Sequence, residues 1–132
     1  MACFDMKVEG NHFSLTIAGE LSRSLFKMEG QLQKVLNGAG LVVMEEMFKH
    51  LDTDGSDIEI GSTIYRVKNK ISKQYHTPYG DIKIPRHVYQ PSGGGATYCP
   101  MEHDGRLIRG NVTPFFAKQI FDKFARNHPR EV

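Results

Sequence analysis

The stretch TPYGDIKIPRHVYQ, residues 77–90, decides the fold because it joins a tight turn to a strand with alternating apolar residues. Three apolar residues of this strand share one parity: Ile82, Ile84 and Val88. Alternate side chains of a strand point to the same face, so these three residues predict a face that packs in a core. Arg86 has the same parity, and the preceding Pro85 lacks a backbone donor, so the direction of the arginine is in question.

Two orientations of Arg86 are compatible with the sequence. Proline occurs at sheet edges and bulges, and a bulge at Pro85 would reverse the parity and turn Arg86 outward. In the alternative, Arg86 stays inward and pairs with an acid such as Glu59. We favour the outward orientation, in which Arg86 and His87 reach past the edge of the sheet.

Two elements are expected before this strand. Residues 4–17 alternate between apolar and polar on both sides of a turn, which predicts a hairpin. The apolar spacing then changes to four and three residues, which predicts a long helix over about residues 20–51. Its apolar seam consists of Leu21, Leu25, Met28, Leu32, Val35, Ala39 and Val42. This seam would either cover the sheets of its own chain or form the dimer face of a coiled coil. We favour packing within the chain, because the hairpins need a cover for their apolar faces, and the two roles are compatible with each other.

The remaining elements complete an α+β fold. Residues 57–101 are expected to form hairpins, and a C-terminal helix is expected over about residues 113–127. Thr113 suits the N-cap of this helix, and Pro114 suits its first helical position. The sequence therefore predicts a single domain over residues 1–132, with a small antiparallel sheet of hairpins packed on a long helix and a second helix at the C-terminus.

Composition is typical of a soluble domain. The 132 residues carry a formal net charge of +2, with 39% hydrophobic and 24% charged residues. This charge is too small to imply nucleic-acid binding unless the cations cluster. No apolar run reaches the roughly 20 residues of a transmembrane helix, and the N-terminus lacks the features of a signal peptide. Cys3 and Cys99 are expected as free thiols, so we expect a soluble, cytoplasmic protein without a membrane partner.

Metal and catalytic sites find little support in the sequence. The acidic turn Asp52–Asp57 does not fit a calcium loop, since Asp57 and Thr63 stand where such a loop needs glycine and glutamate. Cys99 and His103 would supply two of the four ligands of a structural zinc site. We favour a buried thiol near a surface histidine at this position, and we expect no metal, no cofactor and no catalytic residue.

Basic residues cluster in the centre of the chain, and tyrosines are interleaved with them. The candidate DNA-binding residues are Arg66, Lys68, Lys70, Lys73, Lys83, Arg86 and His87. The interleaved tyrosines are Tyr65, Tyr75, Tyr79 and Tyr89. Cations neutralise backbone phosphates, and tyrosines contact sugars, phosphates or unstacked bases, so the pattern is compatible with a nucleic-acid surface. The alternative is a solvated basic face on a soluble domain.

Four segments resemble ISKra-type bacterial insertion-sequence transposases. They are QYHTPYGDIKIPRHVYQ at 74–90, GGGATYCPMEHDGRLI at 93–108, TPFFAKQIFDKFA at 113–125 and the terminal REV. With the preceding helix and hairpin, the resemblance covers about residues 20–132 and concerns the N-terminal region of such proteins. Relatives often carry a cysteine pair near the position of TYCP, where this chain has Cys99 alone, and this difference argues against zinc.

The resemblance implies a mobile-element protein that acts on DNA. In such transposases the matching region precedes the catalytic domain, whose acidic residues bind divalent metal and cut DNA. The chain ends where that domain would begin, so the resemblance assigns a catalytic role to no residue here and implies a truncated protein or an excised module. We expect a non-catalytic module that binds DNA, with the element ends as the candidate target, and that dimerises through the long helix. The alternative is an interaction module that regulates a full-length transposase.

Overall fold

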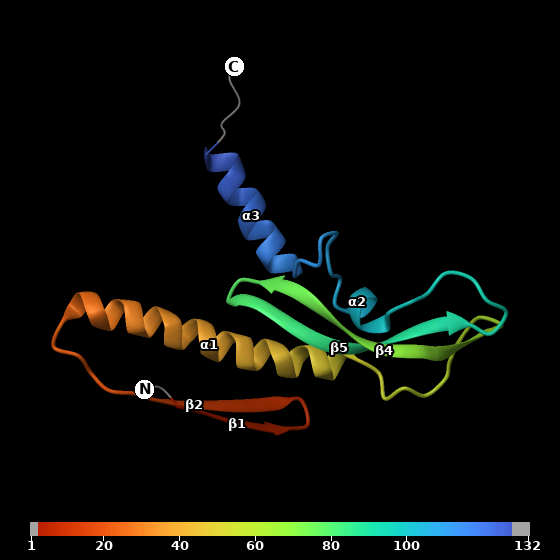
Figure 1. The fold of residues 1–132 in the computed structure, drawn as a ribbon, viewed down its shortest axis with the longest axis horizontal. Coiled ribbons are helices and arrows are strands. Elements are labelled where there is room, and N and C mark those ends of the chain that lie inside the picture. The colour runs from red at the N-terminus through yellow and green to blue at the C-terminus, as the bar shows by residue number, and fades with distance from the viewer. Residues whose placement is uncertain (1–2, 128–132) are drawn as a thin grey trace, which may run out of the picture. The chain divides into compact units, whose positions relative to one another are not determined.

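The structure is a computed structural model that describes residues 3–127 (Figure 1). It contains two small antiparallel sheets, a long helix and a C-terminal helix, so the predicted α+β class is confirmed. The chain divides into two compact units, and the division falls within the long helix between Met44 and Glu45. The single domain expected from the sequence stays a prediction. Among the described residues, no helix is long and apolar enough to cross a membrane.

The first unit contains a two-stranded hairpin formed by β1 (Cys3–Glu9) and β2 (His12–Ala18). The register pairs three apolar residues of β1 with three of β2: Phe4 with Ile17, Met6 with Leu15, and Val8 with Phe13. Paired residues share a face, so all six apolar side chains lie on one face of the hairpin. An isolated hairpin is marginally stable in water, so this face needs a cover.

The long helix α1 (Leu25–Leu51) provides part of that cover through Gly38. A Cβ atom built on Gly38 would lie 3.1 Å from Cζ of Phe4, so the aromatic ring of β1 packs where a side chain would otherwise be. Glycine in a helix interior costs about 1 kcal/mol relative to alanine. The close approach of Phe4 explains why the helix accepts this cost at Gly38.

The helix begins at Leu25, so the predicted start near residue 20 was about five residues too early. Ser24 is the N-cap: its hydroxyl accepts a hydrogen bond from the backbone N–H of Lys27 at 3.3 Å, and its carbonyl accepts one from Met28. A serine that satisfies these free donors sets the first turn more strongly than the apolar spacing does. Leu21, the first residue of the predicted seam, therefore lies outside the helix.

The second unit contains a three-stranded antiparallel sheet in the order β3-β4-β5. Its strands are β3 (Ile58–Ile60), β4 (Thr63–Thr77) and β5 (Gly80–Pro91). The basic segment 68–73 lies inside the single long strand β4, because β5 pairs with β4 from Tyr65 to Thr77. Thr77 closes the turn between β4 and β5: its hydroxyl donates to the carbonyl of Gly80 at 2.7 Å and accepts from the N–H of Tyr79.

The core of the second unit contains aromatic and aliphatic side chains from the sheet and both flanking helices. Its fully buried members include Tyr75, Ile84, Tyr89 and Met101. Tyr75 stacks on Phe48 near the end of α1, with 5.2 Å between ring centroids. Met101 comes from the short helix α2 (Pro100–Asp104). Burying a side chain of this size stabilises the fold by about 1.5–3 kcal/mol.

The C-terminal helix α3 (Pro114–Asn127) confirms the element predicted over about residues 113–127. The segment before it is tied to β4, since the N–H of His76 donates to the carbonyl of Asn111 and the N–H of Thr113 donates to the carbonyl of His76. Most apolar side chains of α3 remain exposed, including Phe121 at 71% and Phe124 at 62%.

Candidate nucleic-acid interface

The register of β4 and β5 divides the predicted DNA-binding residues between two faces of the sheet. Ile71 pairs with Arg86 and Lys73 with Ile84, so these side chains share what we name the Arg86 face. The neighbouring residues lie on the opposite side, which we name the Lys70 face: Lys70, Ser72, Gln74, Lys83, Pro85 and His87. The predicted residues therefore do not form one continuous surface.

Arg86 points into the core, and the predicted outward orientation was wrong. Its side chain is 5% exposed. The Nε–H donates to the hydroxyl of Tyr75 at 2.8 Å, and Nη1 donates to the carbonyl of Ile71 at 3.1 Å. A carboxylate oxygen of Glu102 lies 3.7 Å from Nη2. The inward alternative therefore holds, but the acid is Glu102 on α2 and not Glu59.

Pro85 causes no bulge, because its backbone nitrogen faces the free edge of β5, where no hydrogen bond to β4 is needed. The backbone N–H groups of His87 and Tyr89, at the same parity, donate away from β4 to Asp52 and to Tyr98. A proline at this parity removes no hydrogen bond between β4 and β5. The irregularity lies on the other strand, where the register shifts between Val67 and Asn69 and leaves Lys68 as the extra residue of a bulge.

Glu102 balances two cations of the Arg86 face, the buried Arg86 and the partly exposed Lys73. Besides Arg86, it accepts a hydrogen bond from Nζ of Lys73 at 3.0 Å, and it is about one quarter exposed. Burial raises the pKa of the Tyr75 hydroxyl, which keeps the phenol neutral and able to accept from Arg86. The sequence offered no signal for this network, because Glu102 follows Arg86 by 16 residues, in a segment whose carboxylates show no pattern.

His87 also serves the fold, although it lies on the Lys70 face. Its Nδ1 is 2.9 Å from Oδ2 of Asp52, and its backbone N–H donates to Oδ1 of the same carboxylate at 3.2 Å. The imidazole is 15% exposed. A Cβ built on Gly55 would lie 3.2 Å from Nε2 of His87, and Gly55 has a φ of +89° that favours glycine. His87 therefore ties β5 to the turn after α1.

Three lysines remain as exposed cations: Lys68, Lys70 and Lys83. Within the part of the chain that the structure describes, no acidic oxygen forms an ion pair with any of them. Gln74 pairs with Lys83 and lies four residues from Lys70, so the two lysines on this face are about 13 Å apart along the strand. Arg66 is also exposed, but Oδ2 of Asp57 lies 3.5 Å from its Nε.

The predicted tyrosines do not form a stacking surface for bases. Tyr75 and Tyr89 are fully buried. The hydroxyl of Tyr89 lies 2.6 Å from Oγ1 of Thr53 and donates to the carbonyl of Ser56, which holds the loop after α1 against the sheet. Tyr65 is half-buried and packs edge-on against Tyr98. Tyr79, in the β4–β5 turn, is the most exposed of the four predicted tyrosines, at 42%.

Cys99 is the N-cap residue of the short helix α2, and His103 lies in the last turn of that helix. The described residues, 3–127, contain no group of three or more histidine, cysteine or acidic side chains placed to hold a metal ion. Burial raises the pKa of the Cys99 thiol, which disfavours the thiolate that zinc requires. His103 is exposed, with its Nδ1 at 3.3 Å from a carboxylate oxygen of Asp104.

Comparison with known proteins finds no match: no family model, no curated protein and no solved structure is significantly similar to this chain.

Proposed function

We propose that this chain is a non-catalytic, cytoplasmic module of a transposase-like protein that binds DNA through exposed lysines of β4 and β5. The resemblance of about residues 20–132 to the N-terminal region of ISKra-type transposases supports the DNA target. The observation that carries the proposal is the pair Lys70 and Lys83, which are exposed on one face of the sheet and form no ion pair among the described residues. The nearest acid along β5, Asp81, is bonded to Gln74 and His76 instead. Lys68 in the bulge is a third cation on the same strand.

The chemistry of this surface favours phosphate contacts over base reading. Lysine is a compact point charge that neutralises a phosphate without selecting a base. The polar neighbours Ser72 and Gln74 add hydrogen-bonding groups to the same face. Arg86 and His87 no longer belong to the proposed site, because their side chains bond to protein atoms. Lys73 is left out because Glu102 neutralises it.

A triple variant tests the proposal: Lys68→Ala, Lys70→Ala and Lys83→Ala together. The matched control removes three exposed lysines elsewhere, by Lys7→Ala, Lys27→Ala and Lys123→Ala. Binding to a fluorescently labelled duplex is measured by anisotropy at about 50 and about 200 mM salt, where phosphate contacts change affinity steeply.

Each lost phosphate contact should reduce the steepness of log affinity against log salt by about 1. The site variant loses three lysines, so the steepness of its slope should fall by about 3. The control should retain most of the slope and affinity of the unaltered chain, although both variants lose the same charge. If the two variants bind with the same affinity and slope, the lysines of β4 and β5 are not the DNA site.

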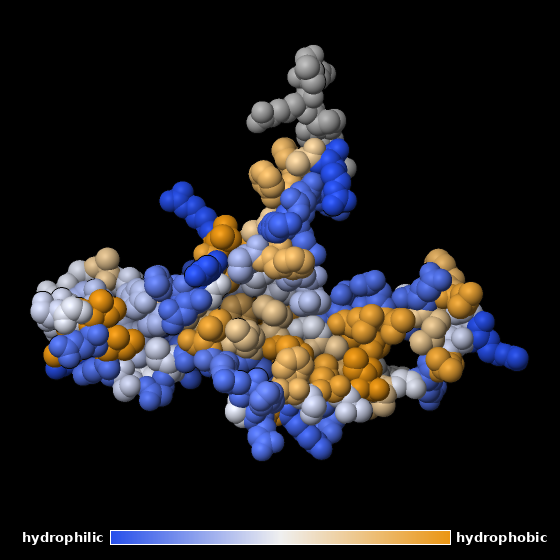
Figure 2. All heavy atoms as spheres, turned by 180° about the vertical axis from the view of Figure 1, so that it is seen from behind, coloured by the Kyte–Doolittle hydropathy of each residue, from blue (hydrophilic) through white to orange (hydrophobic). Residues whose placement is uncertain are grey.

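A second candidate function is self-association through α1, as an interaction module that regulates a full-length transposase. Three leucines at heptad-like spacing on this helix remain exposed: Leu25 at 76%, Leu32 at 46% and Leu36 at 51%. Figure 2 shows apolar side chains on the visible surface over α1 and the β1–β2 hairpin. Leu32→Asp should convert a dimer into a folded monomer by light scattering, with helix content unchanged by circular dichroism.

A further inference from the structure

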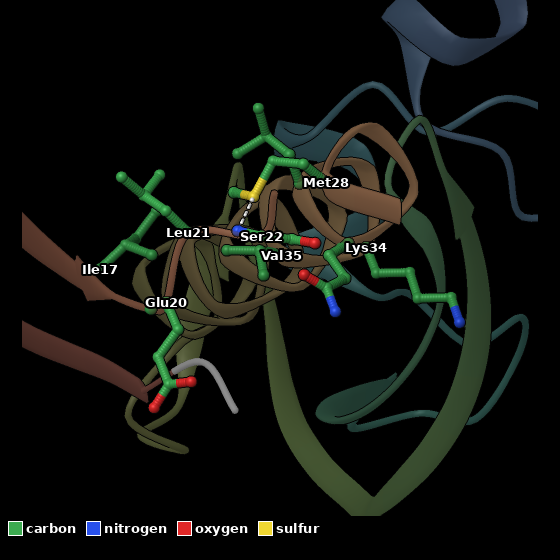
Figure 3. Close-up of a pocket in the computed structure, with 10 residues that line it drawn as sticks. Ile17, Glu20, Leu21, Ser22, Met28, Lys34 and Val35 are labelled. Carbon is green, nitrogen blue, oxygen red and sulfur yellow. Dashed lines mark hydrogen bonds between the residues drawn. The ribbon is translucent and has the colours of Figure 1, made fainter. Parts of the chain in front are cut away.

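An apolar groove runs beside the first half of α1 in the first unit. It has a volume of about 670 Å³ and lies between the end of β2, the linker before α1 and the helix itself (Figure 3). Its apolar lining includes Ile17, Leu21, Met28, Leu32 and Val35. The linker is held on the helix by a hydrogen bond from the N–H of Ser22 to Sδ of Met28 at 3.4 Å, so the groove has a defined wall.

Protruding leucines stand on the same surface as the groove. Leu21 lines the groove but is 92% exposed, and Leu25 in the first turn of α1 is 76% exposed. Leu25 and Leu32 are seven residues apart, so they lie on the same side of the helix. A groove and the protrusions that fit it therefore occur side by side on one copy of the chain.

We propose that the occupant of this groove is a second copy of the chain, in a symmetric contact where Leu21 and Leu25 of each copy enter the groove of the other. In a two-fold dimer the same patch serves both partners, so it must contain protrusion and groove together. This inference rests on the self-association proposed above and names its interface.

The exposed apolar area is sufficient for such a dimer. Five side chains contribute to it: Ile17, Leu21, Leu25, Leu32 and Leu36. From their exposures, they present roughly 600 Å² per copy, so a symmetric contact would bury about 1,200 Å², the lower end of the range for specific interfaces.

The charges around the groove also suit a second copy. Its lining includes one acid and one base, Glu20 and Lys34, and Figure 3 shows their charged ends pointing in different directions. Opposite charges at one patch allow two copies to pair Glu20 with Lys34 across the symmetry axis. The exposed apolar side of α3 is less suited to self-pairing, since Pro114–Asn127 contains three cations and one acid.

Two adjacent residues of the first helical turn provide a matched test. Leu25→Ser removes a protrusion of the proposed interface, whereas Phe26→Ser removes an equally exposed side chain that lies half a turn away from Val35. Sedimentation velocity over a concentration series measures the dimer dissociation constant, and circular dichroism checks the helix. Leu25→Ser should raise the constant about 100-fold, because a symmetric dimer loses two buried leucines, and Phe26→Ser should leave it nearly unchanged.

A photo-crosslink locates the contact independently. With p-benzoylphenylalanine at position 25, irradiation should give a covalent dimer, and peptide mapping should place the crosslink at Met28, Leu32 or Val35 of the second copy. A dimer that Leu32→Asp disrupts but Leu25→Ser leaves unchanged, or a crosslink outside the groove, would overturn this interface and leave self-association standing. A chain that is monomeric at every concentration would overturn both, and the DNA proposal has its own separate test.

Discussion

Replacing Arg86 distinguishes a structural arginine from a DNA-binding one. The informative change is Arg86→Met, which keeps an unbranched apolar side chain and removes the guanidinium. In the structure the guanidinium donates to the hydroxyl of Tyr75 at 2.8 Å and to the carbonyl of Ile71 at 3.1 Å. Hydrogen bonds from a charged donor contribute about 1.5–3 kcal/mol each, so the two together contribute about 3–6 kcal/mol.

Two effects reduce this sum. Methionine carries no charge, so its burial avoids the desolvation cost of the buried guanidinium and offsets part of the lost hydrogen-bond energy. Glu102 is about one quarter exposed and keeps its bond to Lys73, so its separation from Arg86 costs little. We therefore expect a net loss of about 2–4 kcal/mol in the free energy of unfolding, at the upper end of what single substitutions cost.

Urea unfolding followed by circular dichroism measures this loss. Lys83→Met on the Lys70 face is the control, and an exposed substitution of this kind should change stability by less than about 0.5 kcal/mol. A double-mutant cycle with Tyr75→Phe should show a coupling energy of about 1 kcal/mol or more between the two buried side chains. If Arg86→Met changes stability no more than the control and instead weakens DNA binding, the inward network is refuted.

Two further predictions concern the first unit and the thiols. The Cβ added by Gly30→Ala has no atom within 4 Å, so this variant should raise the free energy of unfolding by about 1 kcal/mol. The Cβ added by Gly38→Ala would lie 3.1 Å from the ring of Phe4, so this variant should be stabilised clearly less in urea unfolding. Equal gains for both variants would argue against the packing of Phe4 on α1. Cys99 should react with iodoacetamide more slowly than the exposed Cys3, and its alkylation should need a higher pH, because burial disfavours the thiolate. Mass spectrometry follows each site, and equal rates across the pH range would contradict the burial of Cys99.

Local pattern was sufficient for most of the secondary structure. Alternation in residues 4–17 and 77–90 identified strands, and Pro114 identified the start of α3. These features depend on the spacing of neighbouring residues and on the preference of proline for the first helical position, which the chain carries in any tertiary context. The predicted capping by the side chain of Thr113 was wrong, because its buried hydroxyl has no hydrogen-bond partner among the described residues. The start of α1 could also have been predicted from the sequence, because serine is a preferred N-cap residue and Ser24 directly precedes Leu25.

The candidate site depended on contacts between distant residues, which no local pattern contains. The alternation of β5 showed that Arg86 shares a parity with Ile84 and Val88, but the sequence by itself did not show whether Pro85 reverses that parity. The pairing of β5 with β4 decided it, because Pro85 directs its missing donor to the free edge. The sequence thus determined where most strands and helices form, although the short helix α2 begins inside the region 57–101 that was predicted as hairpins. The tertiary structure decided which cations face solvent, since a charge can be buried only where folding brings a partner such as Glu102 to it.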